Sequence, residues 1–199
     1  MVNILIGATG SVATIKIPLL VDSLKKHSGV NVKVVLTESA YFFVKNEKID
    51  CEVYREQDEW NSWKKLTDPI LHIEARLRNW ADIMLIAPLD ANTLAKVANG
   101  LCDNLLTCIL RAWAMDKPLI ACPAMNTHMW DHPFTAKHLK TLNQDLGFTI
   151  VNPISKKLAC GDIGIGAMAE VATISEVLIE TLGDKWITTE VLQEGKSRK

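Results

Sequence analysis

Short runs of apolar residues alternate along this chain with stretches in which apolar residues recur every three or four positions. The runs lie at 3–8, 32–36, 82–87, 119–122 and 148–151. Such runs are typical of buried strands, whereas the wider spacing is typical of amphipathic helices. Strands that alternate with helices form parallel sheets covered by helices on both faces. The pattern therefore predicts a single-domain α/β fold with a Rossmann-like (flavodoxin-like) parallel sheet.

Helical spacing fills most of the intervals between these runs. It covers 14–27, 40–44, 94–99, 101–115, 131–146 and 175–182, and a short helix is expected to begin in 70–77. The chain has 199 residues, of which 48% are hydrophobic, enough for one sizeable core. We expect the domain to span 1–183, and we expect the polar residues 184–199 to form a flexible C-terminal tail.

Charge and cysteine content argue against several classes of protein. The net charge is −1 and no basic block precedes the last residues, so no nucleic-acid surface is expected. The apolar start lacks a basic leader, and no run approaches the roughly 18 apolar residues of a membrane span. Neither a signal peptide nor a membrane protein is therefore expected. The five cysteines include no C-x-x-C pair, which predicts free, mostly buried thiols in the cytoplasm and no metal site.

The turns after the first two strands carry candidate phosphate contacts. The stretch GATGSVA, from Gly7 to Ala13, joins a strand to a helix, so its N–H groups and the helix dipole suit a phosphate. A tight turn without a ligand explains the same pattern. Thr37 and Ser39 follow the second strand and can also bind a phosphate, although we favour Ser39 as the cap of the next helix.

Two later runs are each followed by a proline and then by small and polar residues. Pro88 and Pro123 lack a backbone donor, so we expect both strands to end there. Asp90 or Asn92 can cap the following helix, and Asn126 comes shortly after Pro123. Because ligands of open α/β sheets bind outside the carboxyl ends of strands, we expect the two loops to meet over one ligand. Asn126 is expected to face a substrate, and the small Ala124 beside it to admit a flat group.

Three further features have more than one interpretation. His72 stands in an apolar surround, where a structural histidine and a general acid–base are both open interpretations. Residues 46–70 are interpreted as a surface excursion whose Trp60 and Trp63 pack on the body or on another subunit. The loop 152–168 has three glycines in six residues and is expected to be a flexible flap that carries Cys160.

Four stretches together make the chain resemble the homo-oligomeric flavin-containing cysteine decarboxylases. They are the GATGSVA turn, LHIE around His72, the P-x-M-N-x-x-M-W signature from Pro123 to Trp130, and ACGDIGIGAM around Cys160. The stretch ANTLAKVANGLCDNLLT from Ala91 extends the match, which covers roughly 3–183. The signature with Pro123 and Asn126 is the most specific of these features.

The resemblance implies FMN bound between the subunits of a homotrimer. The positions similar to the family's cofactor contacts all lie at strand ends, and they are Gly10, Ser11, Val12, Thr37, Ser39, Asp90, Ala91, Asn92, Thr93 and Ala124. Asp90 departs from the serine expected in many relatives, and its carboxylate would repel a phosphate. We therefore expect Asp90 to turn away, to bond a ribityl hydroxyl, or to cap the helix.

The resemblance also implies a reaction and its catalytic groups. The substrate would be 4′-phosphopantothenoylcysteine and the product 4′-phosphopantetheine, a step of coenzyme A biosynthesis. The thiol would be oxidised to a thioaldehyde, CO2 would leave, and the enethiol would be reduced again. His72 is similar to the family's base, and Cys160 to the acid that donates the final proton. The substrate contacts correspond to Asn126, Lys157, Leu158 and Ala159, and Lys156 or Lys157 is a candidate for the substrate phosphate.

Two other functions are known among such relatives. One is a regulatory subunit that inhibits a protein phosphatase, and the other is a peptidyl-cysteine decarboxylase or flavin prenyltransferase. The first is expected to lack the catalytic residues and to carry a long acidic tail, whereas this chain keeps His72, Asn126 and Cys160 and ends in a short basic tail. The complete signature and flap favour the decarboxylase of coenzyme A biosynthesis over the second.

Overall fold

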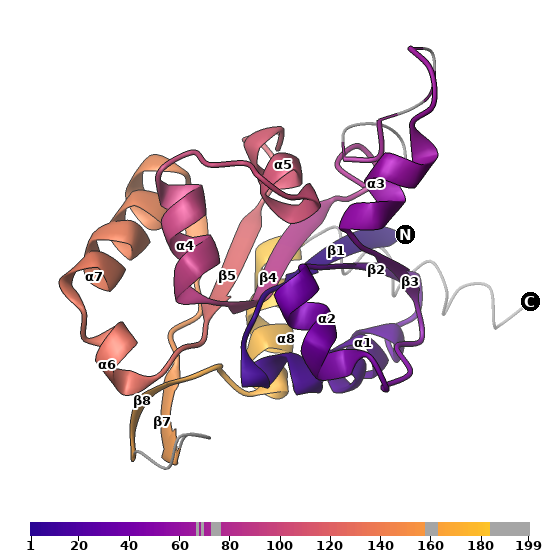
Figure 1. Cartoon of the computed structure of the whole chain (residues 1–199). Helices are drawn as coiled ribbons and strands as arrows, with labels where there is room; N and C mark the ends of the chain where they lie inside the picture. The colour runs from indigo at the N-terminus through magenta and orange to yellow at the C-terminus, as the bar shows by residue number, and fades with distance from the viewer. Residues whose placement is uncertain (67, 69, 73–76, 158–162, 184–199) are drawn as a thin grey trace, which may run out of the picture.

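A six-stranded parallel sheet forms the centre of the molecule, with the strand order β3-β2-β1-β4-β5-β6 (Figure 1). The computed structural model describes residues 1–66, 68, 70–72, 77–157 and 163–183. The strands are β1 Val2–Ala8, β2 Val30–Leu36, β3 Glu52–Tyr54, β4 Ile83–Leu89, β5 Leu119–Pro123 and β6 Phe148–Ile150. The predicted α/β fold with a parallel sheet is confirmed.

Helices cover both faces of this sheet, and a two-stranded antiparallel hairpin stands apart from it. None of the described helices is long and apolar enough to cross a membrane. The helices are η1 Val12–Lys16 (3-10), α1 Ile17–Lys25, α2 Glu38–Val44, α3 Glu56–Ser62, α4 Ala91–Ala98, α5 Leu105–Arg111, α6 Thr127–Trp130, α7 Pro133–Lys140, η2 Thr141–Asp145 (π) and α8 Val171–Leu182, and the hairpin is β7 Ile154–Lys157 and β8 Ile163–Ala167.

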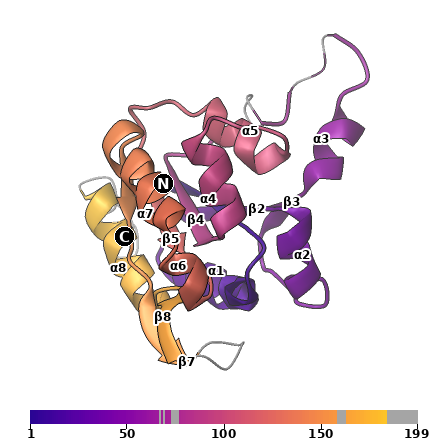
Figure 2. The same cartoon turned by 60° about the vertical axis from the view of Figure 1, so that its left-hand side comes forward.

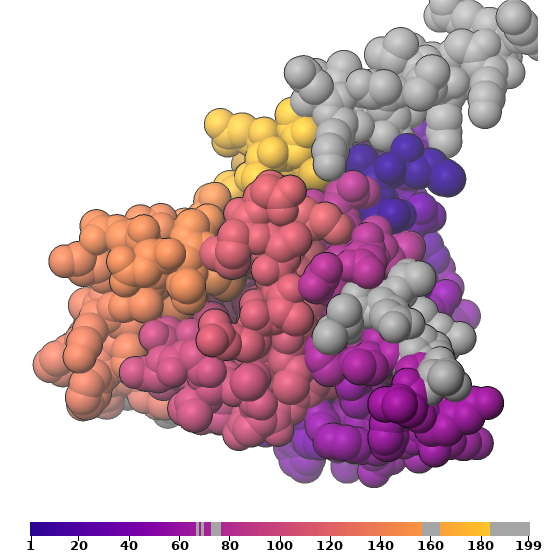
Figure 3. Space-filling model, turned by 90° about the horizontal axis from the view of Figure 1, so that it is seen from above, coloured from indigo at the N-terminus to yellow at the C-terminus, as the bar shows by residue number. Residues whose placement is uncertain are grey.

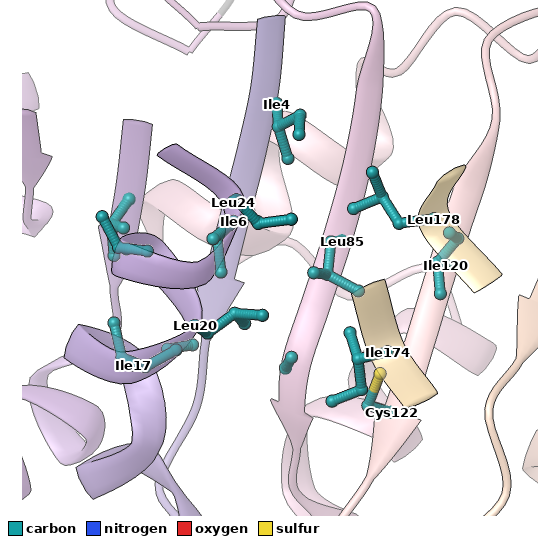
Figure 4. Packing of buried hydrophobic residues seen from close by; sticks show 14 of the residues in the cluster. Ile4, Ile6, Ile17, Leu20, Leu24, Leu85, Ile120, Cys122, Ile174 and Leu178 are labelled. Atoms are coloured by element: carbon teal, nitrogen blue, oxygen red, sulfur yellow. The ribbon is translucent and has the colours of Figure 1, made fainter. Parts of the chain in front are cut away.

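The sheet separates two apolar clusters because successive side chains of a strand point to opposite faces. On one face, Ile6 and Leu85 pack with Leu20 of α1 and Ile174 of α8 (Figure 4). On the other face, the strands pack against α4, α5 and η2. Every residue of β4 is buried, as expected of a central parallel strand covered on both sides. The core therefore holds the carboxyl ends of β1 and β4 in fixed positions.

The sequence predicted five of the six strands of the sheet and missed β3. If the five predicted strands are numbered among themselves along the chain, their order in the sheet is 2-1-3-4-5, as in flavodoxin-like sheets. β3 adds one strand at the edge beyond β2, and the six strands together then have the Rossmann order 3-2-1-4-5-6. β3 consists of Glu52, Val53 and Tyr54 only, and Glu52 is exposed. Three residues are too few to show a period, so this part of the predicted surface excursion could not be recognised as a strand.

The prediction that Pro88 ends its strand is wrong. β4 continues through Pro88 to Leu89, which pairs with Pro123 after a shift of register between Ile86 and Leu89. Pro88 has no N–H to donate, but its carbonyl accepts from the Thr9 N–H at 3.2 Å. Proline is tolerated in a strand where the ladder is irregular. Pro123 is the last residue of β5, as predicted.

The prediction that Ser39 caps the second helix is also wrong. Thr37 is the cap of α2, and its hydroxyl accepts from the Ala40 N–H at 3.1 Å. Ser39 lies inside the first turn of this helix. Both residue types favour N-caps, so the sequence alone did not distinguish them. The predicted helix 101–115 is confined to α5, which starts after its cap Asn104.

The loop 152–168 contains regular structure that the glycine count had hidden. β7 and β8 pair from Ile154–Ala167 to Lys157–Ile163, so the expectation of a long loop is wrong for this part. Residues 158–162, which include Leu158, Ala159 and Cys160, lie outside the described residues. So do residues 73–76 of the predicted helix 70–77, and the tail 184–199.

Removing core volume at Leu85 should destabilise the protein. Leu85 is fully buried, so Leu85→Ala is expected to lower the free energy of unfolding by about 2–5 kcal/mol. Urea denaturation measures this loss. Leu19→Ala is the matched control, because Leu19 on α1 is 59% exposed and should change stability by less than about 0.5 kcal/mol. Equal midpoints for the two variants would contradict the assigned core.

Candidate active site

The carboxyl ends of β1 and β4 are joined by direct hydrogen bonds. The Thr9 hydroxyl donates to the Pro88 carbonyl at 2.9 Å and accepts from the Asp90 N–H at 2.7 Å. The Gly10 N–H donates to the Asp90 carboxylate at 3.0 Å. β1 leads to α1 on one face and β4 to α4 on the other, so this is the switch point where α/β sheets bind ligands. The structure thus brings together two of the segments predicted to bind the cofactor.

Asp90 uses both carboxylate oxygens for backbone N–H groups. Oδ1 accepts from the Thr93 N–H at 2.6 Å and caps α4, while Oδ2 accepts from Gly10. The predicted cap is confirmed, and the carboxylate faces the turn after β1 rather than away from it. A Cβ at Gly10 would lie 2.6 Å from the Ser39 Cβ, so only glycine permits this approach of α2.

The turn after β1 is internally bonded. The Gly10 N–H binds Asp90, the Ser11 N–H binds the Thr9 carbonyl at 2.8 Å, and the Ala13 N–H binds the Ser11 hydroxyl at 3.3 Å. These three N–H groups are therefore not directed at an external anion. Of the two interpretations of this turn, the geometry therefore agrees better with a tight βα turn without a ligand than with a turn that binds a phosphate.

A pocket of about 290 Å³ opens beside this bridge, between α2, α3, α4 and α5. Hydroxyl and amide groups on its wall suit a ligand with several hydroxyls, such as the ribityl chain of FMN. Its lining residues are Leu36, Thr37, Glu38, Ser39, Glu56, Asp90, Asn92, Thr93, Lys96, Asp103, Asn104, Leu105 and Leu106. Five of the predicted cofactor residues therefore share one pocket, namely Thr37, Ser39, Asp90, Asn92 and Thr93.

Charged side chains of the pocket wall already have partners within the chain. Glu38 binds the Arg55 guanidinium through two contacts of 2.5 and 3.2 Å. Lys96 Nζ binds both oxygens of Asp103, at 2.7 and 2.9 Å. Lys96 is thus committed to a carboxylate, so the wall fits the uncharged part of FMN better than its phosphate.

The loop after β5 directs Asn126 outward. The Ala124 N–H donates to the Leu89 carbonyl at 2.9 Å, which places this loop beside the end of β4. Asn126 caps α6, and its Oδ1 accepts from the Met129 N–H at 2.9 Å. Because the oxygen makes the cap, the exposed amide of Asn126 has its N–H donors for a ligand. Ala124 itself is buried, so its contact with a flat group stays a prediction.

The hairpin rests on the same loop. The Met125 N–H donates to the Gly166 carbonyl at 2.9 Å. A Cβ at Gly166 would lie 2.1 Å from the Met125 carbonyl oxygen, and one at Gly164 would lie 2.4 Å from the Thr127 hydroxyl. Both glycines are therefore required for close contact, which fixes the base of the predicted flap against Asn126. Lys156, a candidate for the substrate phosphate, instead lies 3.4 Å from Glu170.

His72 lies apart from this loop. It is in a turn, and its Nδ1 lies 2.6 Å from Oε1 of Glu59 on α3. In Figures 1 and 2, α3 lies on the opposite side of the molecule from α6 and β8. The chain therefore does not bring His72 to Asn126. The sequence analysis gave Glu59 no role at the site. The only available signal was its spacing of three residues from Glu56, which places both side chains on one face of a helix.

Of the four cysteines in the described part of the chain, all are free and only Cys122 is buried. The expectation of mostly buried thiols is therefore wrong for Cys102, which is exposed. Burial raises the pKa of Cys51 and of Cys108 to about 11, so both thiols are protonated at neutral pH. Cys160, the predicted acid, lies outside the described residues.

Replacing Gly166 should detach the hairpin from the Asn126 loop. In Gly166→Ala, the new methyl group would overlap the Met125 carbonyl, so amide exchange in β8 should accelerate by roughly tenfold or more. Hydrogen–deuterium exchange measures this change. Gly147→Ala is the control, because Gly147 also has a positive φ, of 70°, but nothing lies within 4 Å of its Cβ position. Unchanged protection of β8 in Gly166→Ala would contradict the docking.

Comparison with known proteins agrees with this geometry. Residues 1–183 match the profile of the Flavoprotein family. The chain is 55% identical to phosphopantothenoylcysteine decarboxylase of Mus musculus over 86% of this chain and 83% of the mouse protein. Its structure is similar to a cysteine-to-serine mutant of PPC decarboxylase complexed with pantothenoylaminoethenethiol, with a TM-score of 0.83, 48% identity, and coverage of 89% of this chain and 96% of that chain.

A second similar structure is the FMN binding protein AtHal3, with a TM-score of 0.79 and 49% identity, over 88% of this chain and 94% of that chain. Family profile, sequence identity and fold thus agree with the resemblance inferred from the sequence motifs, which is confirmed. The chain belongs to the Flavoprotein family and, within it, to the phosphopantothenoylcysteine decarboxylases.

Proposed function

We propose that this protein is an FMN-dependent carboxy-lyase that converts 4′-phosphopantothenoylcysteine into 4′-phosphopantetheine in coenzyme A biosynthesis. The observation that carries the proposal is the loop after β5, where Asn126 presents amide donors beside a docked hairpin. An amide donor is suited to a substrate carboxylate. Membership of the decarboxylase family supplies the reaction type.

The chemistry requires a transient electron sink. Loss of CO2 from an ordinary amino-acid carboxylate leaves a carbanion that nothing stabilises, whereas a thioaldehyde at the adjacent carbon accepts the electron pair and becomes an enethiol. FMN, when bound, supplies the two-electron chemistry that oxidises the thiol and later reduces the enethiol. The overall reaction exchanges CO2 for a proton, so no second redox partner is consumed.

The cofactor is held by the pocket at the switch point. Thr37, Ser39, Asn92 and Thr93 offer hydroxyl and amide groups to the ribityl chain, which is supported by their shared pocket. Asp90 also lines this pocket. The remaining proposed contacts lie in the adjoining segments, and they are Gly10, Ser11, Val12, Ala91 and Ala124.

Three side chains act on the substrate. Asn126 binds the carboxylate through its side-chain N–H groups and so orients the reacting carbon. His72 takes the proton of the substrate thiol, and Cys160 gives a proton to the enethiol carbon when the saturated thiol forms. Lys157, Leu158 and Ala159 contact the rest of the substrate. The enethiol step is supported by the similar PPC decarboxylase whose cysteine-to-serine mutant is complexed with pantothenoylaminoethenethiol.

The active site lies between the subunits of a homotrimer. The separation of α3 from α6 supports this arrangement, because a neighbouring copy can bring its His72 to the Asn126 loop. Trp60, Trp63 and Leu66 are 70%, 49% and 92% exposed, and large apolar side chains that gather at a surface mark interfaces. Figure 3 shows the purple α3 segment at the surface of the face covered by α4, α5 and α7.

The free thiols support a location in the cytoplasm.

Incubation with 4′-phosphopantothenoylcysteine tests the proposal. The purified protein is expected to be yellow, to release FMN on denaturation, and to form equal amounts of CO2 and 4′-phosphopantetheine, measured by mass spectrometry. Cys160→Ser should stop at the enethiol, because the final proton donor is lost. An FMN-loaded protein that forms neither product would overturn the proposed function.

Asn126→Asp should abolish most activity without unfolding the protein. Aspartate caps helices as well as asparagine does, so the bond to the Met129 N–H is kept and stability should change by less than about 0.5 kcal/mol. The new carboxylate lacks donors and repels that of the substrate. We expect kcat/KM to fall by roughly 100-fold, the equivalent of about 3 kcal/mol for a hydrogen bond to a charged group. Full activity in a stably folded variant would remove Asn126 from its role.

A further inference from the structure

We infer that Glu59 is a positioning residue for the proposed base His72. The Glu59 carboxylate accepts the proton on Nδ1 of His72 and thereby leaves the Nε2 lone pair for the substrate thiol. This inference rests on the proposed function of His72. The observations that carry it are the contact between the two side chains, the burial of the carboxylate, and the anchoring of α3.

The contact is the basis for assigning the ring proton to Nδ1. Glu59 Oε1 lies 2.6 Å from His72 Nδ1, a distance typical of charge-assisted hydrogen bonds. An ionised carboxylate only accepts hydrogen bonds, so Nδ1 must be the donor. In a neutral imidazole the other nitrogen, Nε2, then has no proton and can take one.

Burial of an ionised carboxylate destabilises the folded protein unless a hydrogen bond or an opposite charge compensates for the lost water. The Glu59 side chain is only 14% exposed and that of His72 is 22% exposed. Within the described residues, Oε2 of Glu59 is buried and has no hydrogen-bond partner. A buried oxygen without a partner destabilises the folded protein. The carboxylate is therefore placed where a positive charge on the imidazole, formed when Nε2 takes a proton, would be stabilised.

The neighbouring glutamate fixes the position of this pair. Glu56 stands one turn earlier on α3, and its two oxygens accept from Trp60 Nε1 at 2.9 Å and from the Leu105 N–H at 2.5 Å. The second bond anchors α3 to the first turn of α5, at the wall of the pocket. Glu56 thus holds the helix, and Glu59, three residues later on the same face, holds the histidine.

The proton transfer balances without a further reactant. The S–H bond of the substrate breaks, an N–H bond forms at Nε2, and the resulting imidazolium is paired with the Glu59 carboxylate. The proton on Nδ1 stays on the ring throughout. A neutral side chain at position 59 would keep the contact but not the stabilisation of the charged imidazolium.

Glu59→Gln tests the inference because it keeps the size of the side chain and removes the charge. We expect kcat to fall by roughly 10- to 100-fold, the range for groups that orient a functional histidine, with KM within about twofold. Asp58→Asn is the matched control. Asp58 lies on the same helix and accepts from the Arg55 N–H at 2.6 Å, a bond that an asparagine oxygen can also accept, so Asp58→Asn removes one negative charge from α3 without contacting His72. An equal fall in kcat for Asp58→Asn would show that the loss of any negative charge on α3 has this effect, and would overturn the inference.

A second measurement needs neither substrate nor FMN. Nitrogen-15 NMR of histidine-labelled protein, with His72 assigned by its loss in His72→Asn, should show the neutral ring protonated on Nδ1. In Glu59→Gln, the amide can accept from Nδ1 or donate to it, so this form should no longer dominate. An unchanged form in the variant would overturn the inference. A wild-type protein with the expected form but no decarboxylation would instead overturn the proposed function alone.

Discussion

The Asp90 carboxylate joins the two halves of the sheet at the point on which the site depends. One oxygen caps α4 through Thr93, and the other holds the Gly10 N–H in the turn after β1. At a switch point the chain leaves neighbouring strands toward opposite faces of the sheet. The hydrogen bonds between the strands therefore do not fix the loops after β1 and β4 relative to each other. Asp90 and the Thr9 hydroxyl supply that link, and the pocket walls formed by α2 and α4 follow from it.

The long, regular parts of this fold could be predicted from the sequence because burial on both faces makes them distinct. The runs that became β1, β4 and β5 are apolar apart from the starting residues Asn3 and Asp82, and each lies between two layers of helices. Asn126 could be predicted for the same reason, since a polar residue just after such a strand must lie at the sheet edge. Position along a buried strand thus predicts the location of a side chain, although not the bond that it makes.

What could not be predicted depends on contacts between distant segments. Glu59 is one of several acidic residues in its segment, and only the folded chain shows that it reaches His72, thirteen positions later. Thr37 and Ser39 are equally good caps by type, and the backbone geometry selects Thr37. Gly164 and Gly166 suggested mobility, whereas they permit close packing against Thr127 and Met125. In each case the residue type indicated what kind of interaction was possible, but the sequence did not show which residue would be the partner in that interaction.

The internal bonding of the turn after β1 has a consequence for anion binding. The Gly10 N–H group that would face a phosphate already binds a carboxylate, so the positive end of the turn is partly neutralised. In return, the turn is formed before any ligand arrives, and binding does not have to order it. The pocket beside it presents hydroxyls and an amide, while its nearest cation, Lys96, is paired with Asp103. We therefore expect recognition at this switch point to rely on many neutral donors placed in advance rather than on one strong charge, which suits a ligand with a long polyhydroxy chain.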